Sequence, residues 1–144
     1  MGSVKLDEII ITPLKKIEVV GGNVLHGSDT GFQGFGEAYF SWVQKGFVKA
    51  WKLHTRMTLN LVVPVGKIKL VFLSPVEPAR FRVEIIGEEN YARITVPPGL
   101  WFGFQGVAEK DSLLLNIANI IHEPEETQRK DIESFSYNWM NVHP

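Results

Sequence analysis

Three basic residues recur at every second position in the stretch FVKAWKLHTRMTLN, residues 47–60. Apolar and polar residues alternate there as in a half-buried β-strand, so Lys52, His54 and Arg56 are predicted to share one face. A histidine titrates near neutral pH and can accept a proton from a substrate, while neighbouring cations can bind an anion or polarise a carbonyl group. This face therefore indicates either a solvated strand surface or the wall of a pocket that requires cations.

Short β-like runs that must position these residues recur along the chain, separated by turns rich in Gly, Pro and Ser. β-Branched and aromatic residues dominate the runs. The predicted strands are 8–12, 15–20, 38–43, 47–53, 58–63, 67–73, 81–86, 92–96 and 113–121. One helix-like piece, 122–130, starts near Pro124 with two acidic residues and is short enough for a single turn. This pattern predicts an all-β sandwich or barrel with Greek-key or jelly-roll topology.

Length and composition limit the function classes. The 144 residues predict one domain, 1–144, and the proportions of hydrophobic (44%) and charged (22%) residues are those of a globular protein. A net charge of -1 argues against a generally nucleic-acid-binding surface, and the absence of cysteine excludes disulfides and thiolate chemistry. No apolar run approaches the roughly 18 residues of a membrane span, and the N-terminus lacks a signal-peptide pattern, so we expect a cytoplasmic protein.

A longer motif, GEENYARITVPPGLWFGFQG at residues 87–106, resembles the cupin-fold nucleotide-sugar epimerases typified by dTDP-4-dehydrorhamnose 3,5-epimerase. Leu53-His54 is similar to the strand that carries the catalytic base in that family, and Phe-Gly-Glu at residues 35–37 is similar to a motif near its nucleotide site. The stretch LLLNIANIIHEP, residues 113–124, resembles a strand that bears two tyrosines six residues apart. The shared positions of the long motif are Glu89, Asn90, Pro97, Gly99, Gly103 and Phe104. The resemblance implies a single cupin-type jelly-roll barrel that assembles as a homodimer.

Several positions differ from the pattern of that family. The aspartate that partners the base should lie beyond Trp139, where this chain has no acid, and Asp131 and Glu133 are the nearest carboxylates. The other replacements are Trp51 for an arginine, Phe102 for a histidine, and Asn116 and His122 for the two tyrosines.

The resemblance implies an epimerase, or a closely related isomerase, acting on a nucleotide-linked 4-keto-6-deoxyhexose in deoxysugar or surface-polysaccharide (lipopolysaccharide) synthesis. His54 would be the base that removes a proton next to the carbonyl, and His122 would be the acid that returns one on the opposite face. Lys52 or Arg56 would polarise the carbonyl or hold the diphosphate. This chemistry needs no cofactor.

The remaining predicted substrate-binding residues each have an ordinary structural explanation as well. Glu37 is either a ligand contact or an exposed carboxylate at the start of a strand. Large aromatic residues after Pro-Pro-Gly either stack on a sugar or nucleobase or fill the barrel. Polar residues within the strands either face the pocket or belong to solvated faces. The residues in question are Glu37, Asn60, Arg93, Trp101, Phe102 and Asn116.

Two other hypotheses remain open. One is a binding module, non-catalytic or differently reacting, that keeps the pocket for a nucleotide sugar or carbohydrate, because both tyrosines and the aspartate are replaced. The other is a cupin that binds a small acid or sugar outside nucleotide-sugar metabolism. No metal is expected, because metal-binding cupins use about three histidines, two of them two residues apart, and His54 has no such neighbour.

Overall fold

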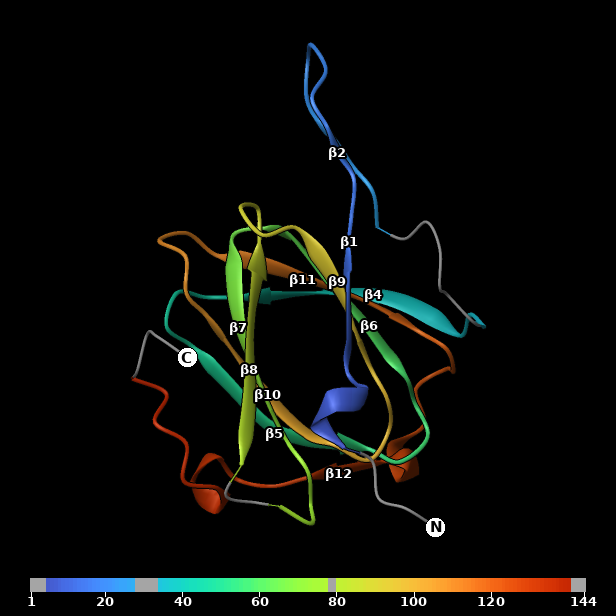
Figure 1. Ribbon diagram of the computed structural model, residues 1–144, viewed down its shortest axis with the longest axis vertical. Coiled ribbons are helices and arrows are strands. Elements are labelled where there is room, and N and C mark those ends of the chain that lie inside the picture. Colours follow the sequence, from blue (N-terminus) through green and yellow to red (C-terminus); the bar gives the residue numbers. More distant parts are fainter. Residues whose placement is uncertain (1–4, 28–33, 78–79, 141–144) are drawn as a thin grey trace.

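The computed structural model describes residues 5–27, 34–77 and 80–140. Within these ranges the chain forms strands and short 3₁₀ turns, with no α-helix (Figure 1). The 3₁₀ turns are η1 (Leu6–Glu8), η2 (Pro124–Glu126) and η3 (Ile132–Ser134). The strands are β1 (Ile10–Pro13), β2 (Lys16–Ile17), β3 (Val24–Leu25), β4 (Glu37–Val43), β5 (Val48–His54), β6 (Leu59–Val65), β7 (Lys67–Leu73), β8 (Phe81–Gly87), β9 (Ala92–Val96), β10 (Trp101–Gly106), β11 (Ser112–Ala118) and β12 (Thr127–Arg129).

Two five-stranded antiparallel sheets pack against each other and enclose the core (Figure 1). The first sheet has the order β1-β9-β6-β11-β4, and the second has the order β12-β5-β10-β7-β8. Most neighbours within a sheet are not consecutive in sequence, so the chain crosses repeatedly between the sheets, as in a jelly roll. The predicted all-β, cupin-type jelly-roll fold is thereby confirmed. The prediction of one domain over 1–144 includes residues outside the described ranges and stays a prediction.

Alternating apolar residues of both sheets fill the space between them. Leu59, Leu61 and Val63 of β6 belong to one cluster of buried side chains together with Leu70 and Phe72 of β7. Each of these residues is at most 2% exposed. Burial of one such side chain stabilises the fold by about 1.5–3 kcal/mol. The period of two that predicts the strands therefore also determines which side chains form the core.

A second apolar cluster lies on the outer face of the second sheet. Trp51 and Trp101 point away from the barrel interior there, and the C-terminal segment packs over them through Phe135 and Trp139. The Trp51 indole N–H also donates a hydrogen bond to the Ile132 carbonyl at 3.1 Å. This cluster holds the segment that follows β12 against β5. Trp101, which the sequence offers as a stacking platform for a ligand, is thus buried on the side of the sheet away from the interior.

An irregularity in β5 changes which of its residues share a face. Along β10, Lys52 is opposite Phe102 and Ala50 is opposite Gly103, so Trp51 is an extra residue in the ladder. One inserted residue exchanges the faces on either side of it. Ala50 therefore packs against the outer cluster, whereas Lys52 lies beside Phe102 of the core. Simple alternation, which places residues 50 and 52 on one face, is wrong across this bulge.

Two segments have a different structure from the one that their sequence predicts. The run WFGFQG lies outside the predicted strands, yet it forms β10, the central strand of the second sheet. Glycine is needed there because a Cβ at Gly103 would lie 2.6 Å from the Cβ of Ala50. The helix-like piece 122–130 is a single 3₁₀ turn, η2, followed by the strand β12.

Candidate active site

A cavity of about 540 Å³ lies between the two sheets. The first sheet contributes Tyr39 and Asn116 to its wall, and the second sheet contributes Lys52 and Phe102. Cavities of this size are typical of small-molecule sites. The wall is apolar with a few polar groups, and in small-molecule sites such polar groups fix the orientation of the ligand.

His54 is the last residue of β5, two residues after Lys52, and is only 4% exposed. Its ring stacks on Phe102, with 6.0 Å between the ring centroids, so the imidazole adjoins the cavity wall. Nδ1 forms a buried hydrogen bond with Oε1 of Glu126. An ionised carboxylate only accepts hydrogen bonds, so Nδ1 carries the proton and Nε2 keeps its lone pair.

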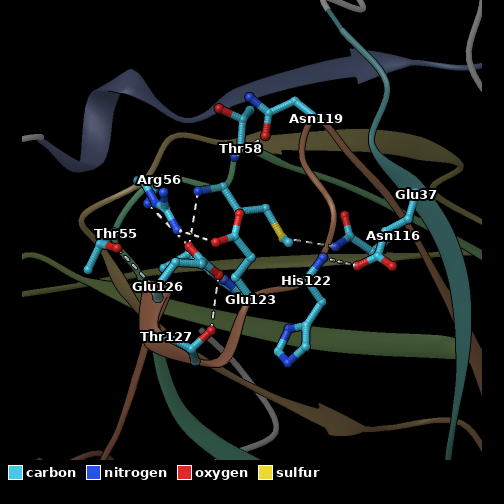
Figure 2. A network of polar contacts seen from close by, with 12 residues as sticks. Glu37, Thr55, Arg56, Thr58, Asn116, Asn119, His122, Glu123, Glu126 and Thr127 are labelled. Atoms are coloured by element: carbon cyan, nitrogen blue, oxygen red, sulfur yellow. Dashed lines mark hydrogen bonds and ion pairs between the residues drawn. The ribbon is translucent and has the colours of Figure 1, made fainter.

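Glu126 is held in place by the backbone around it. Its Oε2 accepts hydrogen bonds from the backbone N–H groups of Arg56 and Met57, each at 3.2 Å, and its Oε1 accepts one from the Thr127 hydroxyl at 3.0 Å (Figure 2). The turn η2 brings the residue there: Pro124 starts it, and β12 then pairs with β5, so that Thr127 lies opposite His54. The carboxylate is 1% exposed, and every contact that it makes favours its ionised form.

The pKa values of the pair leave a neutral imidazole beside a carboxylate. Burial lowers the pKa of His54, although the hydrogen bond and the charge of Glu126 oppose the change. Burial alone would raise the pKa of Glu126, but the hydrogen bonds from His54, Arg56 and Met57 outweigh it and hold that pKa below its usual range. Near neutral pH, His54 is therefore positioned to accept a proton at Nε2, and Glu126 stabilises the imidazolium that forms.

A group of cations surrounds the same cavity. Lys49, Lys52, Arg129 and Lys130 line it, with Asp131 as the nearby acid. Burial lowers the pKa of Lys52, and the positive charge of Arg129 lowers it further, while Glu126 opposes both. A lysine with a lowered pKa gives up a proton more readily, which suits a group that hydrogen-bonds or protonates a carbonyl oxygen. The remaining cations suit an anionic part of a ligand such as a diphosphate.

Three further predicted residues lie around the end of β11. Asn116 faces the cavity and is 2% exposed. His122 lies in the loop between β11 and η2, where its backbone N–H donates to Oε1 of Glu37 at 2.9 Å (Figure 2). Glu37, at the start of β4, thus holds the loop that continues into η2. The structure brings Asn116 together with Lys52 and Phe102 on one cavity.

Besides Trp101, three predicted residues lie on other surfaces of the protein, and Glu37 and His122 do not line the cavity either. Asn60 and Arg93 are on the outer side of the first sheet, because their neighbours Leu61 and Ile94 point into the core. The Asn60 side chain there accepts a hydrogen bond from the Thr95 hydroxyl at 2.8 Å. β5 ends before Arg56, which is exposed in the following turn and forms an ion pair with Glu123 at 3.1 Å. The expected continuation of the basic face from His54 to residue 56 is therefore wrong.

Several residues of this site are not predicted from the sequence, among them Tyr39, Glu126 and Arg129. Glu126 lies 72 residues from His54, inside a stretch that reads as a short helix, so no spacing connects the two. Tyr39 is one of several neighbouring aromatic residues, and only the sheet shows which of them point toward the cavity. No local signal distinguishes Glu126, because Glu123 and Glu125 beside it carry the same carboxylate.

Searches of known proteins found relatives over nearly the whole chain. A dTDP sugar isomerase from Desulfovibrio desulfuricans G20 is 32% identical, with a TM-score of 0.87 over 94% of this chain and 92% of that one. A probable low-salt glycan biosynthesis epimerase from Haloferax volcanii is 28% identical over 100 residues, or 66% of this chain. That alignment spans 64% of the length of this curated relative. No family model matches the sequence.

More distant structures share the fold. A dTDP-6-deoxy-D-glucose-3,5-epimerase from Legionella pneumophila, in complex with dTDP-4-keto-L-rhamnose, has a TM-score of 0.75 at 18% identity over 91% of this chain and 77% of that one. A sugar 3,4-ketoisomerase from Thermoanaerobacterium thermosaccharolyticum, in complex with TDP, has a TM-score of 0.71 at 15% identity over 88% of this chain and 90% of that one.

Proposed function

The chain belongs to the family of dTDP-sugar isomerases and epimerases, and from this premise we propose that it epimerises a nucleotide-linked 4-keto-6-deoxyhexose. The observation that carries the proposal is the buried His54–Glu126 pair beside a cavity lined by Lys52. A base of this kind next to a cation is what removal of a proton beside a carbonyl requires.

The proposed reaction uses only groups of the protein. Nε2 of His54 accepts the proton from the carbon next to the C4 carbonyl; the C–H electron pair forms the enolate, and negative charge develops on the carbonyl oxygen. Lys52 donates a hydrogen bond to that oxygen. A donor on the other side of the sugar then protonates the carbon, so its configuration inverts and no oxidant or cofactor is consumed. His122 is the donor that the sequence predicts.

Hydrogen exchange tests the function directly. The protein is incubated in deuterated water with TDP-4-keto-6-deoxyglucose, a compound found bound to a related 3,4-ketoisomerase, and the sugar is followed by NMR. We expect deuterium at C3 or C5 together with an inverted product. A 3-keto product would instead identify a ketoisomerase, and absence of exchange with several 4-keto nucleotide sugars would leave only the binding-module hypothesis.

The pH dependence of the exchange follows from the state of His54. The base must be neutral, so the rate falls as the pH drops through the pKa of His54 in the folded protein. Burial lowers that pKa, so we expect the acid limb of kcat/KM to lie below the ordinary imidazole value of about 6.5. The check is the kcat/KM of exchange measured from acidic to neutral pH. An acid limb above the ordinary imidazole value would contradict a base whose pKa is lowered by burial.

We also propose that the protein is a homodimer. The hairpin of β2 and β3 projects beyond the barrel (Figure 1) and exposes apolar side chains, among them Ile17, Val20 and Val24. An exposed apolar hairpin is stabilised by packing on a partner, and a second copy offers the same surface in return. The apolar run at residues 9–11 adds little to this argument, because Ile9 is buried and β1 pairs with β9.

Light scattering tests the assembly. At micromolar concentration we expect a mass of about twice the 16.3 kDa of the chain. Val20→Ser, on the projecting hairpin, is expected to shift the equilibrium toward the monomer, whereas Val76→Ser, at another exposed valine, is the matched control. A wild-type protein that remains monomeric at this concentration would contradict the proposal.

The setting of the reaction also remains a proposal. The role of the relative from Haloferax volcanii in glycan biosynthesis supports a role in deoxysugar or surface-polysaccharide synthesis, including lipopolysaccharide. The cytoplasmic location stays a prediction from the sequence. Among the described residues, no helix has the length and apolar character needed to span a membrane.

A further inference from the structure

Tyr39, on β4, places a phenol hydroxyl in the cavity. On β4, Tyr39 and Ser41 line the cavity, while Phe40 and Trp42 point outward and are 62% and 60% exposed. β4 belongs to the first sheet and β5, which carries His54, belongs to the second. The phenol therefore lies on the wall across the barrel from the base.

The hydrogen bonds of Asn116 determine the direction of the Tyr39 proton. The backbone N–H of Asn60 donates to Oδ1 of Asn116 at 3.1 Å, and because a backbone N–H is only a donor, this bond fixes which end of the amide is oxygen. The NH₂ end then points at the Tyr39 oxygen, 3.2 Å away. The phenol oxygen must accept this hydrogen bond, so the O–H proton remains free to point elsewhere, into the cavity.

The same amide connects Tyr39 to the base through a short series of contacts. Nδ2 of Asn116 also lies 3.9 Å from the sulfur of Met57, a contact visible in Figure 2. The backbone N–H of Met57 donates to Glu126, which in turn holds His54. Both ends of the site are thus positioned by one network.

We propose that Tyr39 is the acid that protonates the sugar carbon from the face opposite His54, an inference that rests on the proposed epimerase function. The phenol O–H bond breaks, its proton bonds to the enolate carbon, and the electron pair stays on the phenolate, which Asn116 stabilises. Solvent reprotonates Tyr39 and removes the proton from His54 before the next turnover. His122 is less suited to this position, because Tyr39 lines the cavity and His122 is not among the residues that line it.

The test compares exchange with inversion in Tyr39→Phe, which removes only the hydroxyl. In deuterated water with TDP-4-keto-6-deoxyglucose, the rate at which inverted product forms should fall by at least about 10²-fold. Deuterium should still enter the recovered substrate with its configuration retained, because His54 can return a deuteron to the face from which it took the proton. Trp42→Phe, on the outer face of the same strand, is the matched control and should change neither rate. Thermal melting of both variants checks that they are folded.

Each other outcome overturns the inference in a distinguishable way. Normal inversion by Tyr39→Phe excludes Tyr39 as the acid and leaves the epimerase function intact. Equal loss of exchange and inversion shows that Tyr39 acts before the proton is returned. If His122→Ala separates the two rates instead, His122 is the acid, as the sequence predicts. A wild-type protein that neither exchanges nor inverts any 4-keto nucleotide sugar refutes the proposed function and, with it, this inference.

Discussion

Glu126→Gln is expected to lower the rate of exchange by about 10²- to 10⁴-fold although the side chain keeps its shape. The backbone N–H groups of Arg56 and Met57 are fixed donors, so the amide oxygen of the new glutamine must face them. Its NH₂ group then faces His54 and donates to Nδ1. The imidazole must therefore carry its proton on Nε2, where the lone pair of the base is needed.

Two measurements separate this tautomer effect from damage to the fold. Affinity for dTDP should change little, since Glu126 acts on the base and lies behind it. Glu123→Gln is the matched control: it is three residues away, its ion pair with Arg56 is about half exposed, and such surface pairs contribute about 0–1 kcal/mol. We expect this control to exchange at the wild-type rate. Full activity of Glu126→Gln would show that the carboxylate only supports the structure.

His54→Asn should abolish deuterium exchange, with a loss of about 10²- to 10⁴-fold or more. The asparagine amide can still donate to Glu126, so that the buried carboxylate keeps a partner, but it cannot accept a proton at neutral pH. Nucleotide binding should persist, because the base acts on the transition state and not on ground-state affinity.

The comparison with dTDP titration makes this result specific. A variant that binds dTDP normally and does not exchange identifies His54 as the base. A variant that exchanges at a rate within a few-fold of the wild type would mean that another group, such as Lys52, removes the proton. Loss of binding and exchange together would indicate that the imidazole shapes the cavity, and this outcome would contradict a role limited to proton removal.

Much of the fold is visible in local patterns. β6, β7 and β9 were predicted nearly to the residue, because a strand buried between two others must be apolar on its inward face at every second position. β10 was missed, since Gly103 is selected by contact with Ala50 of a neighbouring strand. That contact exists only after the two strands have paired, and no local periodicity encodes it.

The candidate site was partly visible in the same way. The sequence predicts Lys52 and His54 on one strand face, and they share a face in the structure because both lie beyond the bulge; their roles stay predictions. Asn60 was expected in the pocket because its residue number is even, like those of Lys52 and His54. Whether even-numbered residues face the interior has to be established separately for each strand. The register between β6 and β9 decides that its side chain meets Thr95 on the outer side of the first sheet.

Residue types at short, regular spacing are enough to indicate the family, the all-β class and the histidine most suited to act as a base. What surrounds that histidine depends on the folded chain. Glu126 reaches it across 72 residues, and the phenol of Tyr39 reaches the same cavity from the other sheet. The physical reason is that a hydrogen-bonded site is assembled by strand pairing and sheet packing, and these bring together residues whose distance along the chain carries no information about their distance in space.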